Sequence, residues 1–234
     1  MMSVAPYDER RGRLQTYFDK TAVTAWAHLT SDVKVSGIRQ TVREGRDRMR
    51  AVFMGWLPTD MDGATLLDAG CGTGALSVAV ARRGARIVAV DVAGNLVQIA
   101  RERAPADLCP GRIDFRVGDM LSADHGRFTD VVAMDSLIHY PMREILDVIA
   151  GLAGRTTRSI NFTFAPATPL LSAMHAVGLL FPRSNRAPAI IPVSQSRLTQ
   201  AIAADPRLAA WRVGRTARII NGFYTSQAME LVRR

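Results

Sequence analysis

The sequence predicts an α/β fold built on a doubly wound, mostly parallel sheet that ends in an antiparallel hairpin. Apolar β-prone runs alternate with helical stretches from Ala64 to Phe164, which is typical of strand-helix-strand units with right-handed crossovers. A loop with three glycines follows the first of these runs. Near the C-terminus, Asn221 and Gly222 separate two further β runs, and an Asn-Gly pair in that position is a strong hairpin signal.

Residues 1–60 are predicted to form a helical lid ahead of the main domain, residues 61–234. We expect a first helix over TYFDKTAVTAWAHL, residues 16–29, and a second over residues 34–57. In the second helix an apolar side recurs at helical spacing beside a basic stripe. The apolar side consists of Ile38, Val42, Met49, Phe53 and Trp56, and the stripe of Arg39, Arg43, Arg46 and Arg50. This stripe is either an anion-binding surface or a solvated helix edge.

Five β-prone runs build the predicted parallel part of the sheet, namely ATLLDA, RIVAVD, RIDFRV, TDVVAMD and RSINFTF. Several are apolar throughout, as expected for strands that helices cover on both faces. The intervening helical stretches are GALSVAVARRG, AGNLVQIARERA and PMREILDVIAGLAG. Residues 165–193 then interrupt the alternation with prolines and small residues, so we expect an inserted helix and loop. A capped helix, SQSRLTQAIAADP, follows before the hairpin strands WRVGRTARII and FYTSQAMELV.

The glycine loop, LLDAGCGTGALS, carries glycines at 70, 72 and 74. Glycines at these places let the chain turn tightly from strand to helix and let a ligand approach the backbone. The loop alone is ambiguous, because Gly70, Gly72 and Ala75 also fit the dinucleotide pattern GxGxxG/A.

Three acidic residues near strand ends narrow the choice of ligand. Asp68 precedes the glycines, where a carboxylate suits a cationic amino group and would repel a pyrophosphate. Asp91 ends the second strand, 21 residues beyond Gly70, and can accept hydrogen bonds from ribose hydroxyls of either kind of cofactor. Asp119 follows the third strand, where an adenine amino group would lie; a turn or helix-capping acid is the alternative.

The motif DAGCGTG, with Asp91 and Asp119, resembles the class I S-adenosylmethionine-dependent methyltransferases over residues 64–234. The resemblance implies a Rossmann-like sheet of seven strands, with S-adenosylmethionine as cofactor and S-adenosylhomocysteine as product. In such a sheet, chemistry takes place at the carboxyl ends of the strands. The predicted cofactor-binding residues are Asp68, Gly70, Gly72, Gly74, Asp91, Val92, Asp119, Met120, Asp135 and Ser136.

Further segments narrow the resemblance to one branch: YFDKTAVTAW and IRQTVREGRDRMRAVFMGWL in the lid, DSLIHYP after the fourth strand, and GLLFPRSNRAPAI in the insertion. Together they resemble the magnesium protoporphyrin IX methyltransferases of chlorophyll and bacteriochlorophyll synthesis. This resemblance implies methyl transfer to one propionate of magnesium protoporphyrin IX, giving the monomethyl ester, and gives functional roles to His139 and Tyr17. The segment HLTSDVKVSG departs from relatives, which tend to carry an aromatic, glycine-rich turn there, so the lid contact at this segment stays open.

The expected role of His139 depends on which group accepts the methyl group. A propionate, with a pKa of about 4 to 5, is already ionised at neutral pH and needs no strong base. We therefore expect His139 to orient the acceptor oxygens, with ligation of the porphyrin magnesium as an alternative. A phenol or quinone acceptor would instead require His139 as a general base. Tyr17 either hydrogen-bonds the same carboxylate or packs as a lid aromatic. From a different class, a non-catalytic porphyrin or cofactor carrier is a third interpretation.

The high arginine content indicates either an anionic partner or the codon usage of the genome. The net charge is +9, and 28 of the 30 basic residues are arginine, which either attracts anions or reflects a GC-rich genome. Arg46, Arg183 and Arg186 are the predicted propionate-binding residues, with solvated arginines as the alternative. Aromatics make up 6% of the chain and do not alternate with arginines, so nucleic acid is not an expected partner.

We expect a cytoplasmic protein with possible peripheral contact to an inner or photosynthetic membrane. The charged start argues against a signal peptide, and the longest apolar run, LLSAMHAVGLLF, has 12 residues, short of the roughly 20 that span a bilayer. Cys71 and Cys109 form no metal-binding motif, so we expect no resident metal. A porphyrin-binding subunit of magnesium chelatase is a candidate partner for substrate delivery.

Overall fold

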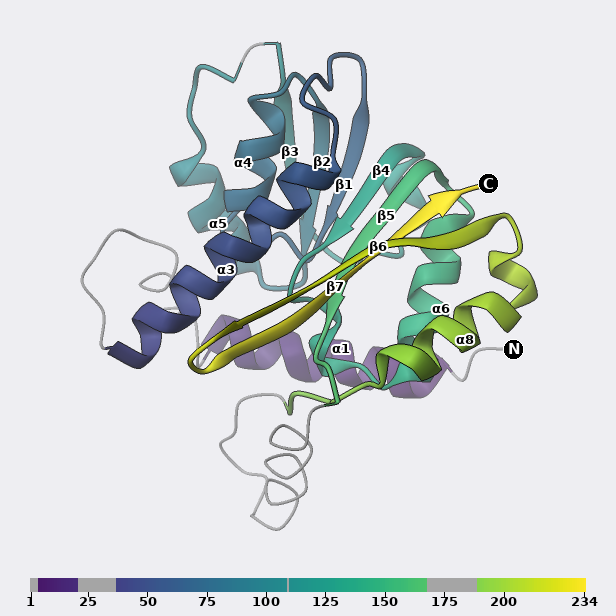
Figure 1. Ribbon diagram of the computed structural model, residues 1–234. Coiled ribbons are helices and arrows are strands. Elements are labelled where there is room, and N and C mark those ends of the chain that lie inside the picture. The colour runs from purple at the N-terminus through teal and green to yellow at the C-terminus, as the bar shows by residue number, and fades with distance from the viewer. Residues whose placement is uncertain (1–3, 21–36, 109, 168–188) are drawn as a thin grey trace.

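The structure, a computed structural model, describes residues 4–20, 37–108, 110–167 and 189–234. These residues form one seven-stranded sheet in the order β3-β2-β1-β4-β5-β7-β6 (Figure 1). Its strands are β1 (Thr65–Ala69), β2 (Arg86–Asp91), β3 (Arg112–Val117), β4 (Phe128–Ala133), β5 (Thr156–Phe164), β6 (Trp211–Asn221) and β7 (Tyr224–Arg233). The first five strands pair in parallel, whereas β7 runs antiparallel to β5 and β6. The predicted doubly wound sheet with a terminal hairpin is confirmed.

Helices cover both faces of this sheet (Figure 1). They are α1 (Val4–Lys20), α3 (Gly37–Trp56), α4 (Ala75–Ala81), α5 (Gly94–Arg103), α6 (Met142–Ala153) and α8 (Gln195–Ala204), with 3-10 turns η1 (Ala123–His125), η2 (Leu137–His139) and η3 (Pro206–Leu208). One apolar core joins α3, α4 and α5 to the sheet, and a second joins α6 and α8 to its opposite face. Because both faces of the central strands are covered, β1 and β4 are almost entirely buried, which explains their continuous apolar sequence.

The first helix differs from the predicted one. The sequence predicts a helix over residues 16–29, but α1 already begins at Val4 and ends at Lys20; residues 21–29 lie outside the described part of the chain. Tyr7 and Leu14 are buried against the main core. Tertiary burial of this kind stabilises helices whose own sequence gives a weak signal.

The second predicted helix agrees with α3, and its two sides separate as expected. Met49 and Phe53 are fully buried against the sheet. On the basic stripe, Arg39 is exposed, whereas the Arg46 side chain is only 17% exposed. The stripe is therefore not uniformly a solvated edge.

The terminal hairpin turns one residue later than predicted. Asn221 pairs with Tyr224 as the last residue of β6, which leaves Gly222 and Phe223 as the two-residue loop. Gly222 has a φ of 57°, which glycine adopts without strain. The Asn221 amide instead leaves the turn and donates to the Thr41 carbonyl of α3 at 2.8 Å.

The two described ends of the predicted insertion meet beside β5. Ala167 N donates to the Val193 carbonyl at 2.9 Å, and Val193 N donates to the Ala165 carbonyl at 2.8 Å. Ser194 then caps α8 by accepting from Arg197 N, as the sequence predicts. The predicted helix LLSAMHAVGLLF, together with Arg183 and Arg186, lies outside the described residues, as does most of HLTSDVKVSG.

Candidate active site

The glycine loop turns from β1 into α4 through positive φ angles at Gly70, Gly72 and Gly74 of 89°, 54° and 78°. The loop passes so close to β4 that a Cβ on Gly70 would lie 2.4 Å from the Ser136 Cβ. At Gly72, by contrast, a Cβ would meet nothing within 4 Å. Gly70 thus allows tight packing, while Gly72 leaves open space beside the loop, as the ligand-binding prediction requires.

Asp91 closes the other side of this loop. Its Oδ2 accepts a hydrogen bond from Gly72 N at 2.8 Å, and its Oδ1 accepts one from Ala93 N at 2.9 Å. Burial raises the pKa of the Asp91 carboxyl, although these two backbone donors oppose the shift. The carboxylate therefore holds the glycine loop and keeps its remaining lone pairs for a ligand.

Asp68 occupies a different place from the expected one. Its side chain is buried beneath the loop and accepts a 2.6 Å hydrogen bond from Ser77 Oγ in α4. Burial raises its pKa to about 6. In this position Asp68 supports the start of α4, and it does not line either hollow described below.

Asp119 is also engaged by protein groups. Tyr7 Oη donates to its Oδ1 at 2.8 Å, and Arg11 Nη1 pairs with its Oδ2 at 2.5 Å. Leu121 N donates to the same carboxylate at 2.9 Å, so Asp119 is a turn acid as well as an anchor for α1. Its neighbours Gly118 and Met120, rather than Asp119, face the hollow.

A hollow opens at the carboxyl ends of β1, β2 and β4, beneath α1. We call it the first hollow. It is lined by Tyr7, Arg11, Leu14, Phe18, Arg46, Gly70, Gly72, Val90, Asp91, Val92, Leu96, Gly118, Met120, Met134, Asp135, Ser136, His139 and Tyr140. The Ser136 Oγ in its wall is buried without a hydrogen-bond partner. Buried hydroxyls are rarely left unpaired, so this atom indicates a ligand contact.

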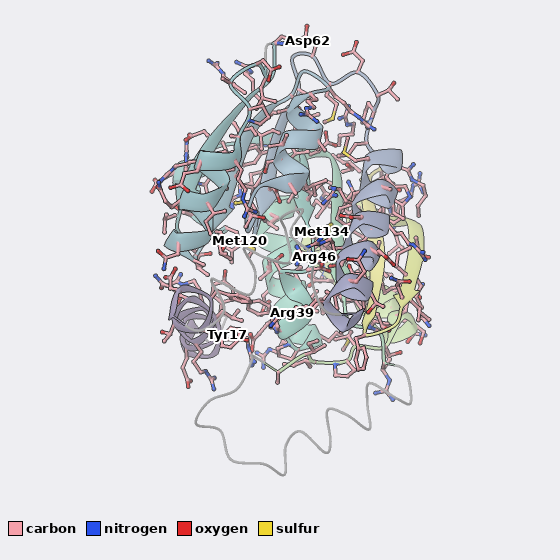
Figure 2. The ribbon with its side chains drawn as sticks, turned by 90° about the vertical axis from the view of Figure 1, so that its left-hand side faces the viewer. Tyr17, Arg39, Arg46, Asp62, Met120 and Met134 are labelled. Carbon is pink, nitrogen blue, oxygen red and sulfur yellow. The ribbon has the colours of Figure 1, made fainter. Side chains whose placement is uncertain are left out.

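A second hollow lies against the first, between α1, α3 and the terminal hairpin. It is lined by Tyr17, Phe18, Val42, Arg46, Asp135, Ile138, His139, Ala165, Ile190, Phe223, Tyr224, Thr225 and Ser226. Phe18, Arg46, Asp135 and His139 line both hollows. In Figure 2, Met120, Met134 and Arg46 lie at the middle of the molecule, with Tyr17 and Arg39 further toward its lower end. The four shared residues mark the junction where groups held in the two hollows would meet.

His139 stands at this junction on the turn η2, directly after β4. Its Nδ1 lies 3.2 Å from the Ala189 carbonyl, and its ring contacts the Phe18 ring with centroids 6.2 Å apart. Tyr17 lines the second hollow with His139 but not the first. The structure therefore brings together the two residues predicted to be catalytic in the second hollow, with His139 also facing the first.

Sequence reasoning missed residues from both ends of the chain. Tyr7, Arg11, Leu14 and Phe18 recur at helical spacing and form the α1 wall of the first hollow; this spacing was a usable signal. Tyr224 and Ser226 reach the second hollow from β7 and carry no local signal, because their contact with Asp135 joins residues 89 or more positions apart.

Comparison with known proteins places the chain in a family. Residues 133–233 match the model of the magnesium-protoporphyrin IX methyltransferase C-terminus, and residues 66–157 match a general methyltransferase domain. The chain is 49% identical to a magnesium-protoporphyrin O-methyltransferase of Rhodobacter capsulatus over 96% of this chain and 97% of that protein. It is 29% identical to the chloroplastic magnesium protoporphyrin IX methyltransferase of Arabidopsis thaliana over 94% of this chain and 70% of that one.

A solved structure agrees with these sequence matches. The magnesium protoporphyrin IX methyltransferase of Synechocystis, crystallised with bound S-adenosylhomocysteine, superposes with a TM-score of 0.82 at 26% identity, over 95% of this chain and 99% of that one. The predicted class I methyltransferase fold is thereby confirmed. From its sequence, its sheet and these relatives, the chain belongs to the family of magnesium-protoporphyrin O-methyltransferases, which are S-adenosylmethionine-dependent enzymes.

Proposed function

We propose that this chain transfers a methyl group from S-adenosylmethionine to a propionate carboxylate of magnesium protoporphyrin IX, giving the monomethyl ester used in chlorophyll or bacteriochlorophyll synthesis. The observation that carries this proposal is the pair of adjoining hollows that share Arg46, Asp135 and His139. One hollow adjoins the glycine loop and the other is lined largely by apolar side chains. Family membership supports the same reaction.

The first hollow fits the cofactor. Gly72 leaves open space beside the loop, Asp91 ends β2 with spare acceptor capacity, and Ser136 Oγ has no partner of its own. Val92, Leu96 and Met120 would cover the flat adenine base, since they provide apolar surface at the strand ends. When bound, S-adenosylmethionine supplies an electrophilic methyl group on a sulfonium sulfur.

The second hollow fits a flat apolar acceptor with a charged edge. Ile138, Ile190 and Phe223 offer apolar surface to a macrocycle, while Arg46 at the junction offers a cation to a carboxylate. The acceptor carboxylate is ionised at neutral pH, so the residues need only aim its oxygen and exclude water. We assign this aiming to His139 and Tyr17.

A mass measurement tests the reaction. The purified chain is incubated with S-adenosylmethionine and magnesium protoporphyrin IX, and the product is analysed by mass spectrometry. We expect a gain of one methylene. A gain seen only with phenol or quinone acceptors would support a different O-methyltransferase with His139 as base, and binding of porphyrin without any methylation would support a carrier.

We also propose that the protein works in the cytoplasm at a membrane surface and receives its poorly soluble substrate there, from the porphyrin-binding subunit of magnesium chelatase. The net charge of +9 favours acidic surfaces. No helix among the described residues is long and apolar enough to cross a bilayer. Liposome flotation with and without acidic lipid tests it: co-flotation only with acidic lipid supports surface contact, and none with either lipid contradicts it.

A further inference from the structure

Asp135 has an unusual backbone and a nearly buried side chain at the junction of the two hollows. Its φ of 57° lies in the left-handed region, which costs free energy for any residue other than glycine. The Asp135 N–H donates to Thr163 Oγ1 of β5 at 2.7 Å. This conformation turns the carboxylate away from the strand direction and toward the terminal hairpin and α3.

Four side chains from other elements converge on this carboxylate. Besides accepting from the Asp135 N–H, Thr163 Oγ1 of β5 donates to Asp135 Oδ1 at 3.4 Å. Tyr224 Oη donates to Asp135 Oδ1 at 2.9 Å, and Ser226 Oγ donates to the same oxygen at 3.4 Å. From α3, Arg46 Nε lies 3.7 Å from Asp135 Oδ2. The Asp135 side chain is only 6% exposed, so these groups take the place of water around its charge.

The hairpin is packed tightly on α3 beside Arg46. A Cβ on Gly45 would lie 2.4 Å from the Tyr224 ring, so α3 approaches the ring as closely as glycine allows. A Cβ on Gly222 at the hairpin tip would likewise lie 2.7 Å from Thr41 Oγ1. Arg46, the residue after Gly45, is thereby fixed relative to Tyr224.

We propose that Asp135 and Tyr224 are positioning residues that aim the Arg46 guanidinium at the acceptor carboxylate and so make the enzyme selective for carboxylate acceptors. A guanidinium carries five N–H donors in a rigid fork and can bind two carboxylates at once. Asp135 holds it from one side, and Tyr224 and Ser226 disperse the Asp135 charge that would otherwise repel an incoming propionate. This inference rests on the proposed function and names the residues that select its substrate.

A binding comparison tests the selectivity without turnover. The probes are magnesium protoporphyrin IX and its dimethyl ester, which keeps the macrocycle but lacks both carboxylates, and binding is followed by quenching of tryptophan fluorescence. Wild type should bind the diacid at least about tenfold more tightly. Arg46→Gln should abolish this preference, and Asp135→Asn and Tyr224→Phe should each reduce it at least about threefold. A preference that persists in all three variants would overturn the proposal.

Two variants of Asp135 and a control test whether the effect on binding comes from the position of Arg46 or from a general loss of folding stability. Asp135→Gly relieves the backbone strain but removes the carboxylate, whereas Asp135→Asn keeps the shape and tolerates the left-handed conformation. Both should raise KM for the porphyrin by a larger factor than they weaken binding of S-adenosylhomocysteine, which is measured beside it because Asp135 lines both hollows. The control, Asp130→Asn, breaks the ion pair between the buried Asp130 of β4 and the partly exposed Arg158 of β5, away from both hollows. If Asp130→Asn raises KM as much as the Asp135 variants, the effect is general destabilisation and the proposal fails.

Kinetics with magnesium protoporphyrin IX distinguish a failure of the proposed reaction from a failure of the proposed positioning role of Asp135 and Tyr224. If wild type forms no methyl ester but prefers the diacid through Arg46, the proposed reaction fails and the carboxylate site stands. If wild type methylates the porphyrin while Asp135→Asn and Tyr224→Phe leave KM unchanged, the reaction stands and the positioning role is refuted. The double variant Asp135→Asn/Tyr224→Phe should raise KM by less than the product of the factors found for the two single variants. Both changes act through the Arg46 guanidinium, so their effects are not independent.

Discussion

Tyr7 and Arg11, one turn apart on α1, bind the two oxygens of the Asp119 carboxylate, at 2.8 Å and 2.5 Å. Asp119 follows β3 at the edge of the first hollow, so this contact ties the N-terminal helix to the sheet edge where the cofactor is expected. α1 lies across the carboxyl ends of the strands (Figure 1) and supplies four residues to the wall of the hollow. Asp119 is therefore one anchor of α1 at this hollow, beside the Arg10–Glu144 ion pair and the hydrogen bonds of Asn95 to Asp19.

The first prediction concerns this anchor. Tyr7→Phe combined with Arg11→Gln should weaken binding of S-adenosylhomocysteine by about fivefold to thirtyfold, because it removes two hydrogen bonds that together contribute about 1 to 2 kcal/mol. Isothermal titration measures the change. Arg13→Gln is the control, since Arg13 is exposed on the same helix and pairs with Glu9 one turn away. Equal affinity of the double variant and this control would mean that α1 does not help to hold the cofactor.

A second prediction concerns Asp91. Asp91→Ala removes the acceptor for Gly72 N and Ala93 N as well as the expected ribose contact, so binding of S-adenosylhomocysteine should weaken at least about tenfold, or 1.4 kcal/mol. Asp91→Asn keeps one acceptor oxygen and should lose less affinity for S-adenosylhomocysteine than Asp91→Ala. Calorimetric titration of both variants checks this order, with the distant Asp62→Ala (Figure 2) as control. Failure of the wild-type protein to bind would refute the cofactor assignment itself.

A third prediction follows from the raised pKa of Asp68, about 6 against an ordinary 3.8. Between pH 4 and 6 the folded protein keeps a proton that the unfolded chain releases, so this group's contribution to stability falls as pH rises through that window. Two pKa units correspond to about 3 kcal/mol. Asp68→Asn should therefore gain stability relative to wild type by up to this amount between pH 4 and 7. Urea unfolding at a series of pH values measures the free energy of unfolding of both proteins. If the two free energies change in parallel with pH, the raised pKa of Asp68 is contradicted.

The local signals in the sequence predicted the local features of the site. The glycine loop and Asp91 were identified because turn chemistry and strand ends are encoded within a few residues. Asp68 and Asp119 are predicted from their places near strand ends to bind the cofactor, and this stays a prediction; their hydrogen bonds with Ser77 and Tyr7 depend on helix packing that no short motif encodes. The helical spacing of Tyr7, Arg11, Leu14 and Phe18 would extend the predicted first helix toward the N-terminus.

Long-range contacts explain which features of the site the sequence does not predict. Asp135 was identified as a site residue from its place after β4, but its left-handed backbone is imposed by Thr163 and the hairpin rather than by neighbouring residues. Tyr224 reaches it across 89 positions. Such contacts depend on the order of strands in the sheet, which places β7 beside β5. For this reason Tyr224 is recognised as a partner of Asp135 only from the fold.

The last prediction concerns His139 and Tyr17, which share the second hollow. His139→Phe and Tyr17→Phe should each lower kcat at least about tenfold, or 1.4 kcal/mol, while affinity for S-adenosylhomocysteine changes little, because neither touches the glycine loop. The pH profile then distinguishes their role. If His139 only aims an ionised propionate, the wild-type rate should be nearly flat between pH 6 and 8. A rate that rises as an imidazole loses its proton, at about pH 6.5, would mean that His139 is a general base, and wild-type turnover in either variant would remove that residue from the mechanism.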